Sequence, residues 1–186
     1  HPYCSRVCCT NSVNDAIRIK EKDPSAKVTI LYRDIRTFGF NELYYQKARD
    51  LGVSFIRFEL ESKPEVAAVG GRLQVKVFDR NIRATVALPA DYLVLAAAFR
   101  PNSGLAEAAQ VYKLPPDMDG FFLEAHVKLR PLDFSSNGFF LAGMAHSPKF
   151  TEEVIAQGRG AAARALGVLA KETLEISGAV AYVNTD

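Results

Sequence analysis

The hydrophobic positions near the start of the chain recur with the spacing of an α-helix. One apolar stripe with i, i+3 and i+4 spacing is formed by Val13, Ala16 and Ile17. This stripe predicts a helix over residues 10–22, whose first turn Thr10 or Asn11 can cap. The helix should end before Pro24, because the residue that precedes a proline is displaced from the helical region.

The next segments predict a strand, a helix and a second strand. Residues 27–34 are rich in β-branched and aromatic side chains, which favours a strand, and residues 53–60 form the next predicted strand. Residues 41–50 between them are expected to form a helix, with Gly52 just past its end. This order indicates a parallel sheet with a right-handed crossover.

The pattern changes after Gly70-Gly71. Residues 72–79 alternate apolar and polar side chains, which predicts a strand. Residues 82–88 are expected to form the antiparallel strand that runs back along it, so together they predict a β-hairpin. Residues 91–99 are almost wholly apolar and are expected to form a strand that is buried on both faces.

The second half of the chain contains several short predicted elements. A short helix is predicted over residues 105–112, and alternation over residues 121–128 indicates another strand. Residues 138–142 predict a short buried strand that leads into Gly143.

One long helix is predicted near the end, from Thr151 to about Leu174. It is rich in small residues, including Gly158 and Gly160, and we expect another backbone to pack very close to it. Residues 179–183 are predicted to be a last strand or a linker.

Composition excludes several classes of protein. The 186 residues are 48% hydrophobic and 24% charged, which is typical of a globular chain and argues against intrinsic disorder. The 23 basic and 21 acidic residues leave a formal net charge of +2, so no binding to nucleic acid or to an anionic membrane is expected. No apolar run approaches the length of a membrane-spanning helix.

The cysteines are the first candidate site. All three lie in one short segment, as Cys4, Cys8 and Cys9, which excludes a disulfide framework and suits a reducing compartment. Clustered thiolates favour zinc or an iron–sulfur cluster, and the positive end of the following helix would stabilise such an anionic group. A fourth ligand would come from a partner, from His1 or from chain upstream. The alternative is three reduced thiols without a ligand role.

The second candidate site is the passage from the predicted strand at 138–142 into the long helix. Gly143 lets a ligand approach the backbone, and the first N–H groups of the helix could bind an anion. His146, Ser147 and Lys149 add polar groups around it. The alternative is an ordinary strand-to-helix turn, in which His146 is a hydrogen-bonded loop residue.

Three motifs resemble those of the heterodisulfide reductase A subunits, a family of iron–sulfur flavoproteins. They are HPYCSRVCCTN at residues 1–11, LYRDIRTFGF at residues 31–40, and DGFFLEAHVKLRP with GFFLAGMAHSPK between residues 119 and 149. The core of this family is similar to thioredoxin reductase, in which a nicotinamide-type domain interrupts a flavin domain.

The resemblance implies an α/β fold in two parts. Residues 1–100 would form an incomplete Rossmann-like (nicotinamide-domain-like) three-layer domain, in which the cysteine motif replaces the glycine-rich loop. Residues 101–186 would form the C-terminal segment of an FAD-binding, disulfide-reductase-like domain. The chain would then be a piece of a longer protein.

The resemblance also implies two cofactors. Cys4, Cys8 and Cys9 would be three of the four thiolate ligands of a [4Fe–4S] cluster, with the fourth ligand upstream of His1. The residues implied to face FAD are Gly143, Met144, Ala145, His146, Ser147, Lys149 and Gln157. Backbone N–H groups after Gly143 would face the flavin or its pyrophosphate, and Lys149 would pair with negative charge on the reduced ring.

The implied function is that of an oxidoreductase subunit of the cytoplasm, which relays electrons between FAD, [4Fe–4S] clusters and partner subunits. Hydrogenase, formate dehydrogenase or ferredoxin would be donors, and a homodimer is a further expectation. Disulfide cleavage would belong to another subunit, so no catalytic residue is assigned and the isolated chain is expected to be inactive.

Two other functions remain as alternatives. One is a structural zinc-binding or partner-docking module without a redox role. The other is an NAD(P)H-dependent pyridine-nucleotide disulfide oxidoreductase, which requires a glycine loop and a redox CxxC pair that this sequence does not show.

Overall fold

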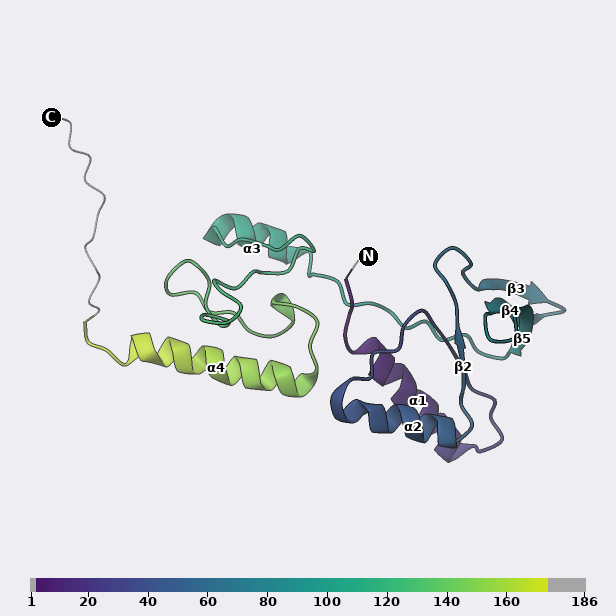
Figure 1. The fold of residues 1–186 in the computed structure, drawn as a ribbon. Helices are drawn as coiled ribbons and strands as arrows, with labels where there is room; N and C mark the ends of the chain where they lie inside the picture. Colours follow the sequence, from purple (N-terminus) through teal and green to yellow (C-terminus); the bar gives the residue numbers. More distant parts are fainter. Residues whose placement is uncertain (1–2, 174–186) are drawn as a thin grey trace. The chain divides into compact units, whose positions relative to one another are not determined.

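The computed structural model describes residues 3–173 (Figure 1). Internal contacts divide these residues into two compact units, residues 3–99 and residues 100–173. The assignment of the two parts to an inserted domain and to a flavin-domain segment stays a prediction. The strand or linker expected at residues 179–183 lies outside the described residues.

The first unit begins with α1 (Cys8–Lys22), which confirms the predicted helix. Its apolar stripe is buried, with Val13, Ala16 and Ile17 only 0%, 2% and 5% exposed. The helix ends where expected, because Asp23 before Pro24 has an extended backbone. It starts two residues earlier than predicted, and neither Thr10 nor Asn11 caps it.

The predicted strand–helix–strand unit is present. The strands β1 (Thr29–Tyr32) and β2 (Ser54–Arg57) pair in parallel, and α2 (Glu42–Asp50) connects them after the short 3-10 helix η1 (Gly39–Asn41). The backbone of Gly52 is left-handed, with φ of +81°, as expected for the residue that ends a helix. Both helices contribute to one core with Val53, so α1 and α2 pack together beside the two strands.

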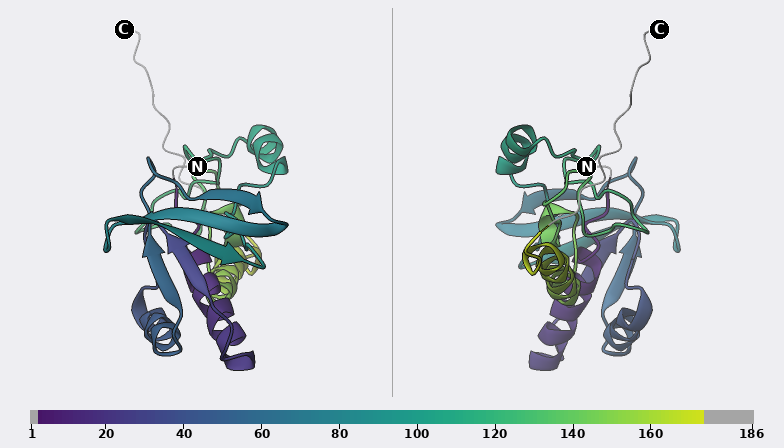
Figure 2. Two further views of the ribbon diagram at one scale, coloured as in Figure 1. Left: turned by 90° about the vertical axis from the view of Figure 1, so that its right-hand side faces the viewer. Right: turned by 90° about the vertical axis from the view of Figure 1, so that its left-hand side faces the viewer.

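The second sheet has three antiparallel strands in the order β3-β4-β5 (Figure 2). The predicted hairpin is confirmed as β4 (Arg72–Asp79) and β5 (Ala84–Ala90). The strand β3 (Glu65–Val69) was not predicted from the sequence, and it pairs with β4 across a two-residue turn at Gly70-Gly71. Both glycines have positive φ, which is the geometry that a tight hairpin turn requires.

The strand expected over residues 91–99 is wrong. The segment forms no strand, and its apolar side chains are exposed, including Tyr92 at 89% and Leu95 at 79%. An apolar run becomes a buried strand only where a neighbouring strand supplies hydrogen bonds, and within the described residues this segment is not paired with one. Its last residue, Phe99, is nevertheless held by the N-terminal loop of the same unit.

The fold is therefore mixed α/β, with one small parallel and one small antiparallel sheet. The three-layer packing of a Rossmann-like domain is not shown, because α1 and α2 share a single core with the two parallel strands that the structure describes.

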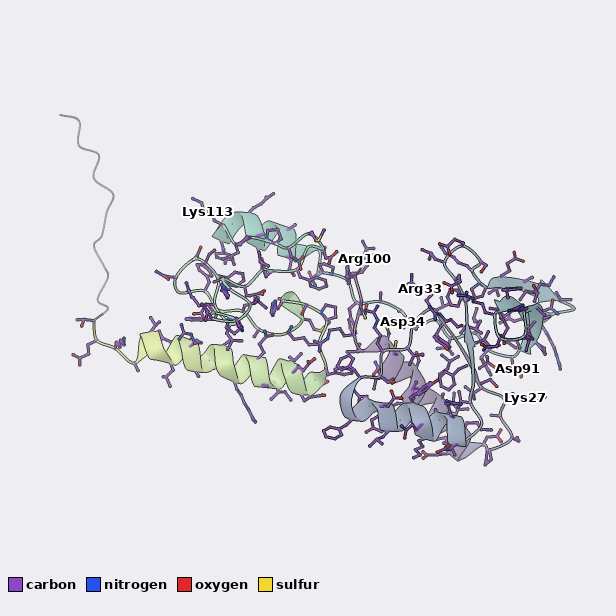
Figure 3. The ribbon with its side chains drawn as sticks, viewed as in Figure 1. Lys27, Arg33, Asp34, Asp91, Arg100 and Lys113 are labelled. Atoms are coloured by element: carbon purple, nitrogen blue, oxygen red, sulfur yellow. The ribbon has the colours of Figure 1, made fainter. Side chains whose placement is uncertain are left out.

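The second unit contains two α-helices, α3 (Gly104–Tyr112) and α4 (Thr151–Leu169), and the 3-10 helix η2 (Gly143–Ala145). α3 confirms the predicted short helix, and the residue that follows it, Lys113 (labelled in Figure 3), has a left-handed backbone with φ of +53°. The buried core consists of Leu114, Phe134 and Leu141, with the rings of Phe122 and Phe139 packed against it.

The strands expected at residues 121–128 and 138–142 are both wrong. These residues form only isolated bridges, which join Pro116 to Phe122, His126 to Arg130, and Asp133 to Phe140. A tight turn over residues 126–130 and the left-handed backbone of Gly138 interrupt any longer ladder. Phe121 and Leu141 are each 2% exposed, but Leu123 and Val127 are 43% and 76% exposed, so the alternation over residues 121–128 established neither a sheet nor a buried face.

α4 ends at Leu169, earlier than the predicted Leu174. It is attached to the preceding loop by Arg164, whose guanidinium donates to both carboxylate oxygens of Asp133 (2.9–3.2 Å). Asp133 is only 5% exposed, so this pair satisfies a carboxylate that is otherwise removed from water. The pairing raises the pKa of Arg164 through its hydrogen bond to that carboxylate.

Two glycines of α4 are expected to respond differently to the same substitution. A Cβ atom added at Gly160 would lie 2.5 Å from Cδ1 of Leu132, whereas one added at Gly158 would have no atom within 4 Å. Gly158→Ala should therefore raise the free energy of unfolding by about 1 kcal/mol, because alanine is the better helix former. Gly160→Ala should raise the free energy of unfolding by less than this, or lower it, because the Leu132 side chain must move to make room for the new methyl group. Equal effects in denaturant titrations of both variants would contradict this packing.

Candidate functional site

The three cysteines surround the start of α1. Cys4 lies in the N-terminal loop, while Cys8 and Cys9 are the first two residues of the helix. All three are free thiols and are partly exposed. Burial, followed by the neighbouring Cys9, raises the pKa of the Cys8 thiol.

The loop that carries Cys4 is fixed by contacts with Phe99. The hydroxyl of Tyr3 donates to the carbonyl of Phe99 (2.7 Å), and the N–H of Phe99 donates to Oγ of Ser5 (3.0 Å). Ser5 is only 3% exposed, so its hydroxyl is a buried anchor. The residues around Cys4 thus have a structural role, which the spacing of the thiols did not indicate.

The segment after β1 supplies polar groups to the same site. The thiol of Cys9 donates to the carbonyl of Asp34 (3.6 Å), and Arg36 forms an ion pair with the Asp34 carboxylate (2.9 Å). Asp34, which is labelled in Figure 3, lies two residues after the last residue of β1. The hydrogen bond to Asp34, and next the charge of Cys4, raise the pKa of Arg36. A cation therefore lies beside the thiols.

The N-terminus of α1 has unsatisfied hydrogen-bonding capacity. Val7 occupies the cap position and offers no side-chain acceptor to the first N–H groups. Thr10, in the first turn, is 5% exposed, and its hydroxyl is a buried side-chain oxygen without a partner among the described residues. Uncapped N–H groups and a helix dipole favour an anion at this end of the helix.

The thiols do not form a ready metal site. Within residues 3–173, no three His, Cys, Asp or Glu side chains converge as metal ligands would. The chemistry of the donors suits a soft metal or an iron–sulfur cluster, but their present geometry does not. The assignment of Cys4, Cys8 and Cys9 as ligands stays a prediction.

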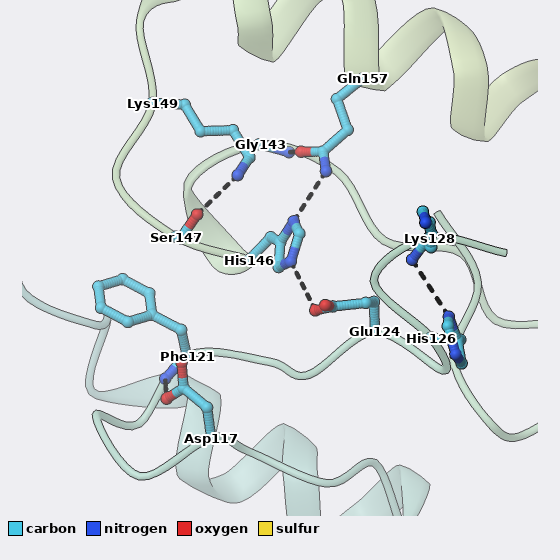
Figure 4. Close-up of polar contacts among 10 residues, drawn as sticks. All are labelled: Asp117, Phe121, Glu124, His126, Lys128, Gly143, His146, Ser147, Lys149 and Gln157. Carbon is cyan, nitrogen blue, oxygen red and sulfur yellow. Dashed lines mark hydrogen bonds and ion pairs between the residues drawn. The ribbon is translucent and has the colours of Figure 1, made fainter. Parts of the chain in front are cut away.

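The second candidate site is the turn formed by η2. Gly143 is buried and has φ of +72°, a backbone conformation that glycine adopts readily. The structure brings five of the predicted residues together at this turn and on the facing side of α4, namely Gly143, His146, Ser147, Lys149 and Gln157 (Figure 4). Met144 and Ala145 belong to the same turn.

Several polar groups of this turn are engaged with one another. The N–H of Gly143 donates to Oε1 of Gln157 (2.7 Å), and Nζ of Lys149 donates to Oγ of Ser147 (2.6 Å). Nδ1 of His146 lies 2.8 Å from Nε2 of Gln157. These two bonds use one lone pair of the Gln157 oxygen and one hydrogen of its amide nitrogen, so they hold the side chain in place between Gly143 and His146.

Glu124 is a further member of this cluster, and it was not predicted from the sequence. Its carboxylate lies 2.8 Å from Nε2 of His146. Burial acts to raise the pKa of Glu124, but its backbone hydrogen bond and the contact with His146 outweigh burial and lower it. No local pattern in the sequence distinguishes this glutamate from a surface residue, so only the folded chain reveals the pair.

The first turn of α4 already holds a protein carboxylate. The N–H of Phe150 donates to Oε2 of Glu153 (2.8 Å), and Glu152 adds a second acidic side chain. These two carboxylates already interact with the positive end of the helix dipole and would repel a further anion. They therefore disfavour the anion site that the sequence suggested at the start of α4. An apolar hollow of about 290 Å³ adjoins the η2 turn and is lined by Ala142, Ala145 and aromatic rings.

None of the helices in the described part of the chain is long and apolar enough to cross a membrane. No family model matches the chain.

Three curated relatives are similar over most of the chain. The A subunit of the ferredoxin:CoB-CoM heterodisulfide reductase of Methanosarcina acetivorans is 39% identical over 98% of the chain and 22% of its own length. The iron-sulfur A subunit of the CoB–CoM heterodisulfide reductase of Methanocaldococcus jannaschii is 36% identical over 99% of the chain and 28% of its own length. The A subunit of the H(2)/formate:CoB-CoM heterodisulfide,ferredoxin reductase of Methanococcus maripaludis is 38% identical over 87% of the chain and 25% of its own length. The chain thus spans about a quarter of each relative.

Proposed function

We propose that this chain, which is homologous over nearly its whole length to a part of the heterodisulfide reductase A subunits, serves in an iron–sulfur flavoprotein oxidoreductase. In that role it relays electrons between FAD, [4Fe–4S] clusters and partner subunits. The observation that carries the proposal is identity of 36–39% over 98–99% of the chain to proteins named as such subunits.

In this proposal Cys4, Cys8 and Cys9 are three ligands of a [4Fe–4S] cluster, which supplies one-electron transfer when it is bound. The free thiols, the uncapped start of α1 and the unpartnered hydroxyl of Thr10 support an anionic group at this position. Since the thiols do not converge within the described residues, cluster binding requires the loop from Cys4 to Val7 to move. A fourth ligand comes from outside the chain.

The FAD contacts belong to the turn at Gly143. The backbone of Gly143, Met144 and Ala145 approaches the flavin or its pyrophosphate, and the adjoining apolar hollow suits a flat ring. Lys149 remains close enough to the turn to provide positive charge, while Ser147 orients its ammonium group. His146 and Gln157 act mainly by holding the turn, because their side chains bond to each other.

Residues 1–100 are proposed to be a converted Rossmann-like domain and residues 101–186 a flavin-domain segment. The parallel β1–α2–β2 unit supports the first assignment, because it is one repeat of such a fold. The cysteine loop would then stand where a dinucleotide-binding loop precedes its helix.

The partners proposed for the chain are the other subunits of a cytoplasmic heterodisulfide reductase-like complex. The relatives' names mention H(2), formate and ferredoxin, which supports hydrogenase, formate dehydrogenase or ferredoxin as electron donors.

Metal analysis tests the redox role. The chain would be reconstituted anaerobically with iron, sulfide and an added small thiol as fourth ligand, and iron, sulfide and zinc would be quantified per chain. About four irons with matching sulfide are expected for a [4Fe–4S] cluster. Zinc without sulfide, after parallel purification in the presence of both metals, would instead support a structural zinc module and reject the cluster.

Gly143→Val should lower FAD occupancy in the longer protein proposed here, because a side chain would block the approach of the backbone to the flavin. Gly39→Val is the matched control, since Gly39 also has a positive φ (+63°) and lies in the other unit. Flavin per chain is measured by absorbance of the folded variants. Full flavin retention by folded Gly143→Val would remove Gly143 from the site.

A further inference from the structure

His146 joins three segments of the second unit through consecutive hydrogen bonds (Figure 4). Its Nε2 lies 2.8 Å from Oε2 of Glu124, and its Nδ1 lies 2.8 Å from Nε2 of Gln157 on α4. Oε1 of Gln157 in turn accepts the N–H of Gly143 (2.7 Å). The side chains of His146 and Glu124 are only 19% and 13% exposed, so water competes weakly for these bonds.

The chemistry of the donors fixes the position of every proton in this chain of bonds. A backbone N–H can only donate, so the atom of Gln157 that faces Gly143 must be the carbonyl oxygen. The amide NH₂ of Gln157 then faces Nδ1 of His146, and because it can only donate, Nδ1 must carry no proton. The single ring proton therefore resides on Nε2 and is donated to the Glu124 carboxylate.

We infer that Gln157 and Glu124 are positioning residues that hold His146 as the neutral Nε2–H tautomer, and that the ring can gain a proton at Nδ1 only when Gln157 releases Gly143. A second ring proton would point at the NH₂ of Gln157. Rotating the amide relieves that conflict but turns the NH₂ toward the N–H of Gly143, so their bond is lost. Protonation of His146 and the hydrogen bond of Gly143 exclude each other.

As a consequence, the hydrogen bond that holds the turn at Gly143 depends on the protonation state of His146. We call this arrangement of Gly143, Gln157 and His146 the latch. The charged groups that face it are Glu124 and Lys149; Lys149 also acts on the Glu124 carboxylate. The relevance of the latch to FAD rests on the proposed function. The hydrogen bonds of the latch do not depend on that proposal. Its tests therefore use the chain without flavin.

The position of the ring proton is tested by ¹⁵N NMR of the histidine nitrogens near neutral pH. The wild-type chain should show a protonated Nε2 and a bare Nδ1 at His146. His126 is an internal reference, because its Nδ1 accepts the N–H groups of Lys128 and Leu129 (both 3.2 Å) without Gln157. A proton on Nδ1 of His146 in the wild-type chain would overturn the proposal.

The role of Gln157 is tested by two substitutions. In Gln157→Glu the carboxylate accepts from both Gly143 and Nδ1, so both ring nitrogens should be protonated under conditions in which the wild-type ring holds one proton. In Gln157→Leu the N–H of Gly143 loses its acceptor, and its amide exchange should accelerate roughly fivefold, as expected for one hydrogen bond. Gln110→Glu on the exposed side of α3 is the charge-matched control.

The outcomes separate this inference from the flavin proposal. An unchanged His146 ring in folded Gln157→Glu, judged by an intact His126 signal, would overturn the latch whatever the chain binds. If the ring shows the expected shifts in this chain but the longer protein binds no FAD, the flavin proposal alone is overturned.

Discussion

Cys8→Ala is expected to lower the iron content of the reconstituted chain from about four ions to nearly none, because a cubane cluster needs thiolate ligands and the chain provides three. Cys8 is the central candidate, since it lies at the first position of α1 and interacts with both Cys4 and Cys9. Iron and sulfide assays, with the visible absorbance of the cluster, measure the loss.

The control for this prediction is Asn11→Ala. Asn11 is exposed on the first turns of α1 and carries no thiol, so its removal should leave iron and sulfide unchanged. Comparable secondary structure in the two variants would show that the helix is intact. An unchanged iron content in Cys8→Ala would remove Cys8 from the ligand set.

Leu141→Ala is expected to be the most damaging apolar truncation in the second unit. Leu141 is 2% exposed and packs in the core with Leu114 and Phe134, and its N–H donates to the carbonyl of Leu132 (2.8 Å). Truncating a leucine in such a place costs about 2–5 kcal/mol through lost burial and the remaining cavity. That amount is a large part of the stability of a small domain.

The matched variant is Leu129→Ala, because Leu129 belongs to the same unit but is 78% exposed. Its free energy of unfolding should change by less than about 0.5 kcal/mol. Denaturant titration of both variants measures the difference. Similar values for the two would show that Leu141 is not in the core of the folded chain.

Helices were predicted better than strands in this chain. The spacing of Val13, Ala16 and Ile17 determined both the helix and its buried face, because helical hydrogen bonds are local and need only one apolar side. The strand over residues 91–99 failed because a strand depends on a partner that its own residues do not specify.

The candidate sites divide in the same way. Sequence motifs identified the cysteines and the residues around Gly143, because residue type and spacing are sufficient to recognise these groups. The partners of these residues were not predictable, since Glu124 reaches His146 across 22 positions and Asp34 reaches Cys9 across 25.

The sequence by itself determined the helices α1, α2 and α3, the parallel pairing of β1 with β2, and the resemblance that the relatives support. The helices depend on local hydrogen bonding and on the residues that end them, the parallel pairing follows from the order strand, helix, strand, and the resemblance rests on residue identity. Only the tertiary structure decided that the segment after β5 stays unpaired within the described residues, that the thiols there do not converge on a metal site, and that the His146 ring lies between Glu124 and Gln157. Each of these depends on which groups approach from distant parts of the chain, and the residues next to a position in the sequence do not determine which groups those are.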